Sequence, residues 1–302
     1  MVFQKKTPLG GRMEINMKSK KKILIAGGDM RQIYCASRLL SEYTASTIGF
    51  DEELIPSAIS FPPTEEKFPF DYAILPVLPM NEAGMISTPC FSGSISIDDI
   101  KNLLTPDGII FAGRIDEKLR ESFKGYQLCD YMESESLNLK NAVPTAEGAV
   151  QIALEELPVT LSGLRVLIVG MGRIGRALAE ILKGFGSDVT AAVRNAKGTA
   201  NARIHGIKSV CTDKMDSNYD LVFNTVPHIV FDHDRLEKFD EKTLFIDLAS
   251  KPGGIDFDTA TELGIKAIWA LGLPGKTAPI TSGEIIAETV IDMITEMEEA
   301  HG

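Results

Sequence analysis

The fold is decided by the stretch Leu164–Gly175, which reads LRVLIVGMGRIG. A short apolar run enters the turn Gly170-x-Gly172-x-x-Gly175, and a segment with helical period follows it. Strand, glycine turn and helix in this order are typical of a dinucleotide-binding βαβ unit, whose first helical N–H groups face the phosphates. The alternative is a doubly wound turn without a ligand. The residues of this turn expected to hold a cofactor are Gly170, Gly172, Arg173, Ile174 and Gly175.

The composition is that of an ordinary globular protein. The chain has 302 residues, 44% hydrophobic and 24% charged, so two domains are expected. The net charge of −11 argues against a nucleic-acid partner, because phosphates require a basic surface. We find no apolar run near the ~20 residues of a membrane span and no signal-peptide core. The four cysteines and four histidines lack metal-site spacing, so we expect no metal and a reducing cytoplasm.

Alternating strand and helix patterns predict two α/β domains with a cleft between them. We expect a disordered tail over residues 1–21, a smaller N-terminal α/β domain over 22–136 and a hinge helix over 137–163. A Rossmann domain with a doubly wound parallel sheet should cover 164–281, and a helix over 282–302 should pack back on the N-terminal domain. Residues 141–144 should be extended, because the residue before Pro144 avoids the helical region. Thr145 would then cap a helix that runs to Glu156.

Short apolar segments predict the strands. In the N-terminal domain these segments cover 22–27, 47–50, 72–77 and 108–112. Helices should run through about Tyr43, over 97–104 behind the cap Ser96, and over 116–123. In the C-terminal domain the expected strands cover 165–170, 188–193, 207–210, 221–224, 244–248 and 265–269. Apolar residues at helical period predict a last helix from 282 to about 297.

The strand after the glycine turn indicates which nicotinamide cofactor fits. An NAD site places Asp or Glu at the end of that strand for the ribose 2′-hydroxyl, whereas a nearby Arg accommodates a 2′-phosphate. Here the acid is missing, and Arg194 and Lys197 flank Asn195. We therefore expect these three residues to bind NADP rather than NAD. The alternative is a pair of solvated cations at a strand exit.

Three loops follow later strands of the same domain, where doubly wound sheets place ligands. They are rich in glycine, proline and small residues, so their backbone could contact the nicotinamide half of the cofactor; the alternative is that they only turn the chain. The residues expected to contact the cofactor are Thr225, Val226, Pro227, Ala249, Ser250, Gly272, Leu273 and Pro274. His228 has no obvious acidic partner, so a role in acid–base catalysis is not favoured, and Trp269 is expected in the core.

The N-terminal domain offers a polar loop after its first strand, Gly27-Gly28-Asp29-Met30-Arg31-Gln32. It lacks the third glycine of a dinucleotide fingerprint, so a substrate-facing loop fits better than a second nucleotide site. Arg31 could grip a carboxylate bidentately, and Asp29 could orient Arg31 or act as a base. The alternative is that Asp29 is an ordinary helix N-cap.

Five stretches resemble the A-subunit family of bacterial dipicolinate synthases, in that family's order. They are Gly27–Gln32, Val143–Gly148, Gly170–Gly175, Asp247–Gly254 and Gly272–Pro279. The resemblance implies that the chain acts with the flavoprotein-like B-subunit of dipicolinate synthase in the mother cell of sporulating bacteria. Together the two chains would oxidise a dihydro- or hydroxytetrahydrodipicolinate from the lysine pathway to dipicolinate. The acceptor would be NADP, as Arg194 and Lys197 indicate.

A substrate with two carboxylates requires cations in this acidic protein. Loop position and resemblance together imply a catalytic set of Asp29, Arg31, Gln32, Thr145, Glu147 and Lys251. Arg31 and Lys251 would bind carboxylates, Thr145 would donate a hydroxyl hydrogen bond, and Glu147 is a candidate base. Lys251 stands where related chains can carry arginine, a change that keeps the charge and loses the forked geometry. These groups and the glycine turn should share one cleft.

Two other functions stay open at the level of sequence. One is a different dehydrogenase on the same scaffold, for a 2-hydroxy acid, a shikimate-like compound or a folate. A hydroxy-acid enzyme would need a histidine paired with a carboxylate near the late loops, and residues 271–279 contain none. The other is a non-catalytic NADP-binding subunit whose partner chain carries the chemistry. Whichever function holds, we also expect the chain to form a homo-oligomer.

Overall fold

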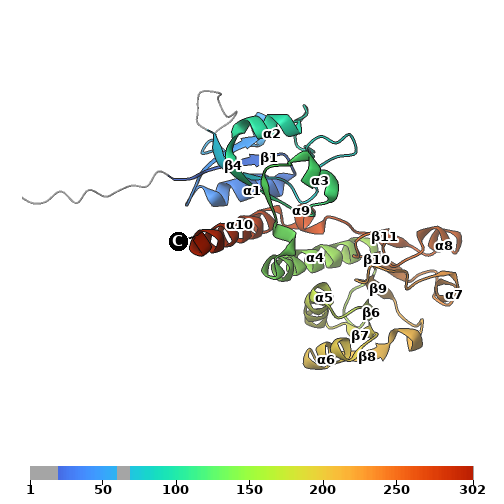
Figure 1. The fold of residues 1–302 in the computed structure, drawn as a ribbon. Helices are drawn as coiled ribbons and strands as arrows, with labels where there is room; N and C mark the ends of the chain where they lie inside the picture. Colours follow the sequence, from blue (N-terminus) through green and yellow to red (C-terminus); the bar gives the residue numbers. More distant parts are fainter. Residues whose placement is uncertain (1–19, 60–68, 302) are drawn as a thin grey trace, which may run out of the picture.

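The computed structural model describes residues 20–59 and 69–301, which form two parallel sheets with helices on both faces (Figure 1). The two-domain α/β architecture expected from the sequence is confirmed, including a doubly wound sheet around the glycine turn. Residues 1–19 of the expected tail lie outside the described part of the chain. No helix within the two described ranges is long and apolar enough to cross a membrane.

The described strands of the N-terminal sheet are β1 (Lys22–Ala26), β2 (Thr44–Ile48), β3 (Phe70–Ile74), β4 (Leu104–Ala112) and β5 (Gln127–Asp130). They run parallel in the order β2-β1-β3-β4-β5. Helices α1 (Met30–Leu39), α2 (Ile97–Leu103) and α3 (Glu117–Ser122) connect them, with short 3-10 turns at Glu52–Leu54 and Tyr131–Glu133. Ile23 and Ile25 pack on one side of the sheet and Leu24 on the other, because side chains alternate along a strand.

The C-terminal sheet contains β6 (Arg165–Val169), β7 (Asp188–Val193), β8 (Lys208–Cys211), β9 (Leu221–Asn224), β10 (Leu244–Asp247) and β11 (Ala267–Trp269). Their parallel order is β11-β10-β9-β6-β7-β8. The chain adds β7 and β8 on one side of β6 and then crosses over to add β9, β10 and β11 on the other side, so the strand order reverses between β6 and β9. Its helices are α5 (Arg173–Gly184), α6 (Ala196–Ile204), α7 (His233–Leu236) and α8 (Phe257–Glu262). Ligands of doubly wound sheets bind where the order reverses, at the carboxyl ends of the strands.

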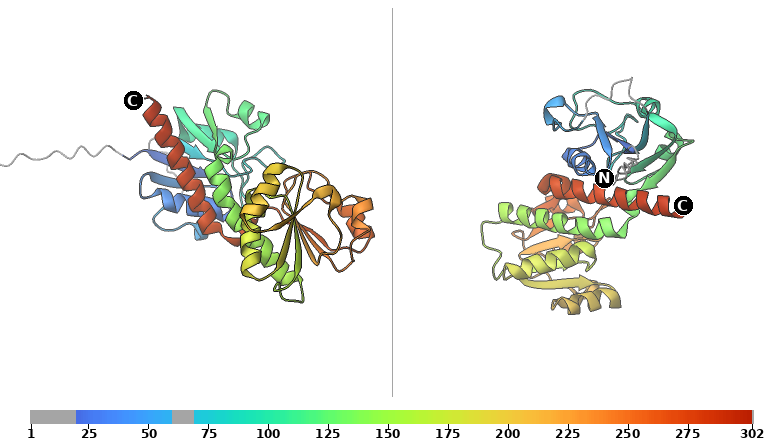
Figure 2. Two further views of the ribbon diagram at one scale, coloured as in Figure 1. Left: turned by 90° about the horizontal axis from the view of Figure 1, so that it is seen from below. Right: turned by 90° about the vertical axis from the view of Figure 1, so that its left-hand side faces the viewer.

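Two long helices, α4 (Glu135–Glu156) and α10 (Pro279–His301), lie between the two sheets (Figure 2). Helix α10 packs on α1, with Ile286, Val290 and Ile294 in the core of the N-terminal domain. Helix α4 contacts α10 and also packs on α5, where Ala146, Ala149 and Ala153 share a core with Leu178 and Leu182. The short helix α9 (Leu273–Thr277) leads into α10 and contacts α4. The helices therefore connect the two sheets through a continuous stack.

The prediction that residues 141–144 are extended is wrong, because α4 continues through Pro144. The Pro144 ring removes one helical hydrogen bond, at a cost of about 3 kcal/mol. Packing offsets that cost, since Pro144, Ala146 and Gly148 are all buried. Thr145 does not cap the helix; its Oγ1 donates to the Asn141 carbonyl, 2.7 Å away.

Several other boundaries differ from the expected ones. The second strand is Thr44–Ile48 rather than 47–50, because Gly49 turns the chain with φ +84°. Helix α1 ends at Leu39 instead of near Tyr43, and the third strand starts and ends earlier than predicted. Strand β5 and helix α9 are not predicted from the sequence. Ser96 does cap α2, with a reciprocal capping box to Asp99.

Candidate functional site

The glycine turn after β6 has the geometry that a pyrophosphate requires. Gly170 has φ +95°, and a Cβ there would lie 2.5 Å from Thr225 Oγ1. A Cβ on Gly175 would overlap the Gly170 carbonyl, so these two positions accept only glycine. A Cβ on Gly172 would meet no described heavy atom within 4 Å, so the backbone faces open space there. Gly172 also begins α5 without a side-chain cap, which leaves the first N–H groups of the helix for an anion.

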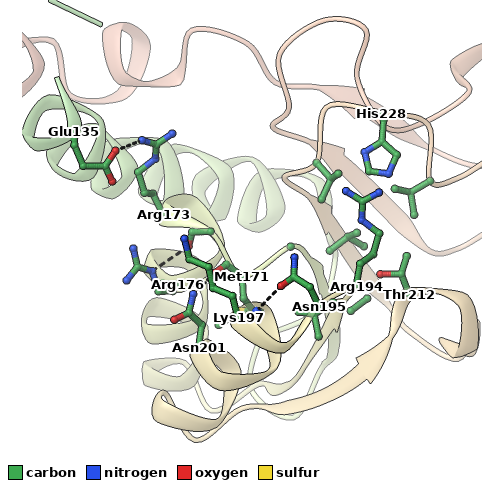
Figure 3. Close-up of a pocket in the computed structure, with 18 residues that line it drawn as sticks. Glu135, Met171, Arg173, Arg176, Arg194, Asn195, Lys197, Asn201, Thr212 and His228 are labelled. Atoms are coloured by element: carbon green, nitrogen blue, oxygen red, sulfur yellow. Dashed lines mark hydrogen bonds and ion pairs between the residues drawn. The ribbon is translucent and has the colours of Figure 1, made fainter. Parts of the chain in front are cut away.

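A cavity of about 670 Å³ opens beside this turn (Figure 3). Its size and its position at the carboxyl ends of β6, β7 and β9 suit a dinucleotide. The lining residues are Glu135, Val169, Gly170, Met171, Gly172, Arg173, Arg176, Ala192, Val193, Arg194, Asn195, Lys197, Gly198, Asn201, Thr212, Val226, His228 and Val230. The residues present therefore fit a nicotinamide dinucleotide.

The charged side chains around the cavity are mostly cationic. Arg173, Arg176, Arg194 and Lys197 line it, and Glu135 is the one acid among the described lining residues. Glu135 Oε2 lies 2.6 Å from Arg173 Nη1, at the end of the cavity next to α4 (Figure 3). The end of β7 therefore presents positive charge, and none of the described lining residues beside it is a carboxylate.

Side-chain amides fix the geometry of the cavity wall. Asn195 caps α6, with Oδ1 accepting from Gly198 N at 2.9 Å. Asn201, further along α6, donates to the Met171 carbonyl at 2.9 Å and so ties the helix to the glycine turn. In Figure 3 the Arg194 side chain extends from the end of β7 toward His228. Sequence reasoning does not find Arg176, Asn201, Thr212 and His228 as lining residues, because their membership depends on how α5, α6 and the loops meet.

A buried carboxylate organises the loops after β9 and β10. Asp247 Oδ1 accepts from Asn224 Nδ2 at 2.7 Å and from Ala249 N at 3.0 Å, and Oδ2 accepts from Gly254 N at 2.7 Å. Asn224 also bonds to both backbone groups of Val226. Two loops with expected cofactor contacts are thus held by one hydrogen-bond network, which sequence reasoning misses. The sequence feature that could indicate this network is Asp247 at the end of a strand, followed by Gly253-Gly254.

Trp269, expected in the core, is half-buried and supports the same loop. Its Nε1 donates to the Ala249 carbonyl at 2.9 Å, and its ring stacks on Phe257 with centroids 5.4 Å apart. Thr225 Oγ1 donates to the Val169 carbonyl at 2.8 Å. Of the expected cofactor residues, Ile174, Gly175, Thr225, Pro227, Ala249, Ser250, Gly272, Leu273 and Pro274 are not among the lining residues of the cavity.

Asp29 and Arg31 form a tight ion pair at the start of α1. Asp29 Oδ1 accepts from Arg31 N at 3.1 Å and from Arg31 Nε at 2.9 Å, and Oδ2 accepts from Nη2 at 2.7 Å. Burial opposes both charges, but the partner's hydrogen bonds and charge outweigh it. The pKa of Asp29 is therefore lowered and the pKa of Arg31 raised from their ordinary values. Asp29 is at once the helix N-cap and the partner that orients Arg31.

Arg31 faces the C-terminal part of the chain rather than the outer surface. Its side chain is only 16% exposed. A Cβ on Gly275 of α9 would lie 2.8 Å from Arg31 Nε and 3.0 Å from Asp29 Oδ2. The ion pair is therefore enclosed between α1 and the segment that follows β11.

Gln32, expected in the catalytic set, is buried and hydrogen-bonded inside the N-terminal domain. It is 2% exposed, and its Nε2 donates to the Leu75 carbonyl at 2.9 Å. The hydroxyl of Tyr131 donates to the same carbonyl at 3.0 Å, and burial raises the pKa of that hydroxyl well above its ordinary value. Gln32 therefore joins the end of β3 to α1 and is closed off from solvent.

The other expected catalytic residues lie apart from the dinucleotide cavity. Glu147 is exposed and lines a groove between α4 and α10, together with Lys140, Glu284 and Glu288. Lys251 is exposed in the loop after β10 and forms no ion pair with a described residue. Neither residue lines the cavity beside the glycine turn. Within residues 20–59 and 69–301, no three His, Cys, Asp or Glu side chains gather as a metal site would require.

Comparison with known proteins assigns both halves of the chain. Residues 22–132 match the family of the dipicolinate synthase A-subunit N-terminal domain. The A-subunit of dipicolinate synthase from Bacillus subtilis (strain 168) is 30% identical over 292 residues, covering 93% of this chain and 98% of the relative. The chain belongs to the dipicolinate synthase A-subunit family. Residues 141–252 match the D-isomer specific 2-hydroxyacid dehydrogenase, NAD binding domain. This member of the family therefore carries a nicotinamide-binding domain of the dehydrogenase type.

Solved structures agree with this family. The crystal structure of the dipicolinate synthase A-subunit from Bacillus halodurans has a TM-score of 0.83 at 30% identity, covering 91% of this chain and 98% of that one. A transhydrogenase from Sinorhizobium meliloti has a TM-score of 0.70 at 13% identity, covering 92% and 94%. The second likeness shows the fold alone.

Proposed function

We propose that this chain is the NADP-dependent oxidoreductase subunit of a dipicolinate synthase. The substrate is dihydrodipicolinate, or hydroxytetrahydrodipicolinate after loss of water, and the product is dipicolinate. Dihydrodipicolinate loses one hydride and one proton at a CH–CH bond, and the ring becomes aromatic. The observation that carries the proposal is the cationic cavity beside an open glycine turn, in a chain of this family.

The bound cofactor would supply a hydride acceptor, and the chain's own residues would bind and orient both ligands. The N–H groups at the start of α5 and the Arg173 guanidinium would bind the pyrophosphate. Arg194, Asn195 and Lys197 would bind the 2′-phosphate. The Asp247 network would hold the loops after β9 and β10 in place, so that their backbone can contact the nicotinamide half.

Arg31 and Lys251 are the proposed cations for the substrate carboxylates. Asp29 fixes the Arg31 guanidinium and backbone through four hydrogen bonds, and its lowered pKa makes it a poor proton acceptor. We therefore propose that Asp29 orients Arg31 rather than acting as the base. Glu147 lines a different groove, so we do not propose it as the base that accepts the substrate proton.

The reaction is tested with the chain alone and mixed with the flavoprotein-like B-subunit of the same sporulating cell. Each preparation receives a dihydrodipicolinate-forming system and NADP⁺, and dipicolinate and NADPH are followed together. We expect both products in equal amounts. NADPH formed by the chain alone would exclude a purely scaffolding role. Failure of both preparations would remove the assignment to dipicolinate.

The preference for NADP is tested by the double variant Arg194→Ala/Lys197→Ala. Loss of two charge-assisted contacts to the 2′-phosphate should lower kcat/KM for NADP⁺ by about a hundredfold and change kcat/KM for NAD⁺ by less than about threefold. Arg203→Ala is the matched control, because Arg203 lies on α6 outside the cavity. Equal losses with both cofactors would contradict the assignment of the 2′-phosphate site.

A further inference from the structure

The edge of the N-terminal sheet carries one unusual backbone conformation. Arg114, just after β4, has φ +47°, and it is the one non-glycine residue with positive φ among residues 20–59 and 69–301. Side-chain-bearing residues avoid this left-handed region, and strain of this kind persists only where surrounding contacts enforce it. A glycine would adopt the same conformation without cost. An arginine at this position therefore carries a backbone strain that a glycine would avoid.

Asp130 enforces the turn at Arg114. Its Oδ1 accepts from Arg114 N at 3.2 Å, and its Oδ2 accepts from Ile115 N at 2.8 Å. Asp130 is the last residue of β5 and pairs with Ala112 at the end of β4. On the other side, a Cβ on Gly113 would lie 2.8 Å from Val77 Cα. The backbone is thus fixed on both sides of Arg114, and its exposed side chain starts from a defined point at this edge of the sheet.

Arg114 and Arg31 differ in what their guanidinium groups contact. Asp29 occupies Nε and Nη2 of Arg31. The Arg114 side chain is exposed and has no hydrogen bond or ion pair with any described residue. An arginine with an open fork matches a carboxylate through two parallel hydrogen bonds.

The topology brings both arginines to the same edge of the sheet. Strands β1, β3 and β4 are neighbours, and their carboxyl ends meet there. Gly28 and Gly113 both adjoin Pro76: a Cβ on Gly28 would lie 2.9 Å from Pro76 Cβ, and Gly113 N donates to the Pro76 carbonyl at 3.3 Å. Arg31 and Arg114 therefore flank the loop after β3.

The same edge is connected to the dinucleotide cavity. Asp130, which holds Arg114, also accepts from Met132 N at 2.8 Å in the 3-10 turn before α4. Glu135, five residues after Asp130, lines the cavity and pairs with Arg173. Five residues span at most about 18 Å, which is within the length of a dinucleotide.

We propose that Arg114 is a carboxylate-binding residue for the dicarboxylate substrate, at a site that includes Arg31. The inference rests on the proposed function. The two carboxylates of a diacid can take cationic contacts besides those of Arg31 and Lys251, and Arg114 offers an open guanidinium on a fixed backbone in a protein with a net charge of −11. Through this contact the site binds a dicarboxylate more tightly than a monocarboxylate of the same ring.

Arg114→Gly is the central variant, because glycine keeps the left-handed turn and removes the side chain. We expect KM for the dicarboxylate to rise about tenfold or more, KM for NADP⁺ to change by less than about twofold, and Tm to hold or rise. Arg114→Lys should keep part of the affinity. Arg203→Gln, which removes one charge from an exposed site on α6, should leave both KM values unchanged.

Calorimetry with dipicolinate and with pyridine-2-carboxylate separates this inference from the proposed function. The wild-type chain should bind dipicolinate more tightly than the monoacid, and Arg114→Gly should lose that preference. If turnover of the wild type fails while this binding pattern holds, the proposed reaction is wrong and the carboxylate site stands. An unchanged KM and unchanged dipicolinate binding in Arg114→Gly would overturn the inference. Equal losses for NADP⁺ and dicarboxylate, or a lowered Tm, would indicate a structural role and overturn it as well.

Discussion

At the scale of single residues, Asp29 has both of two roles considered for it, the N-cap of α1 and the partner that orients Arg31. Its carboxylate caps α1 through Arg31 N and binds the guanidinium of the same residue. Because Arg31 follows Asp29 by two positions, Asp29 Oδ1 can accept hydrogen bonds from both the backbone N and the side-chain Nε of Arg31. The result is a cation held in a defined orientation between α1 and α9.

The ion pair predicts a pH-dependent contribution to stability. Because the pKa of Asp29 is lowered in the folded chain, its contribution is fully present above the unfolded-state value of about 3.9 and is lost as pH falls through the folded value. Asp29→Asn should therefore lower Tm near pH 7, and the difference from wild type should shrink below about pH 4. Thermal melts between pH 3 and pH 8 measure this, with Asp107→Asn as an exposed control. A difference that stays constant over the range would contradict it.

At the scale of elements, local signals predicted those helices and strands that carry strong periodicity and caps. The glycine turn, the strands beside it and the Ser96 cap follow from such signals. Helix α4 does not, because the rule for residues before proline is local, whereas the buried alanine face that outweighs it packs on a separate helix, α5, beyond β6. Strand β5 (QLCD) lacks the continuous apolar run that marks the equally short strands β9 and β10, and helix α9 has five residues, too few for a helical period.

The crossing of α1 and α10 predicts a sensitive glycine. A Cβ on Gly283 would overlap the Arg31 carbonyl and lie 2.9 Å from Cys35 N, so two helix backbones would have to separate. Gly283→Ala should lower the free energy of unfolding by about 1–3 kcal/mol despite its better helix propensity. Urea denaturation measures the change. Gly184→Ala in α5 is the control, because a Cβ there meets no described atom within 4 Å and should be neutral or stabilising. Equal stability of the two variants would show that α10 can shift without cost.

At the scale of the whole molecule, the site is assembled from segments that the sequence keeps far apart. The cavity beside the glycine turn was predictable in part, because the turn, Arg173, Arg194 and Lys197 lie within one βαβ unit. The Asp247 network, Asn201 and Arg114 were not, because each depends on contacts between separate strands and loops. The same assembly joins the two domains near the cofactor cavity, where Glu135 at the start of α4 pairs with Arg173 at the start of α5.

The ion pair between Glu135 and Arg173 predicts that Glu135, at the start of α4, opposes cofactor binding. A dinucleotide pyrophosphate and Glu135 are both anionic, and both would compete for the Arg173 guanidinium. Glu135→Gln should therefore lower Kd for NADPH by about two- to fivefold at low salt, and the gain should shrink in about 0.5 M salt as charges are screened. The unliganded Tm should change little, since exposed ion pairs contribute about 0–1 kcal/mol.

Fluorescence titration with NADPH measures the effect of Glu135→Gln. Glu133→Gln is the matched control, because Glu133 is an exposed acid two residues away that does not line the cavity. If Glu135→Gln instead weakens binding, the carboxylate holds Arg173 in the orientation that the pyrophosphate needs, and the pair assists binding. The sign of one affinity change thus decides whether the start of α4 competes with the cofactor or prepares its site.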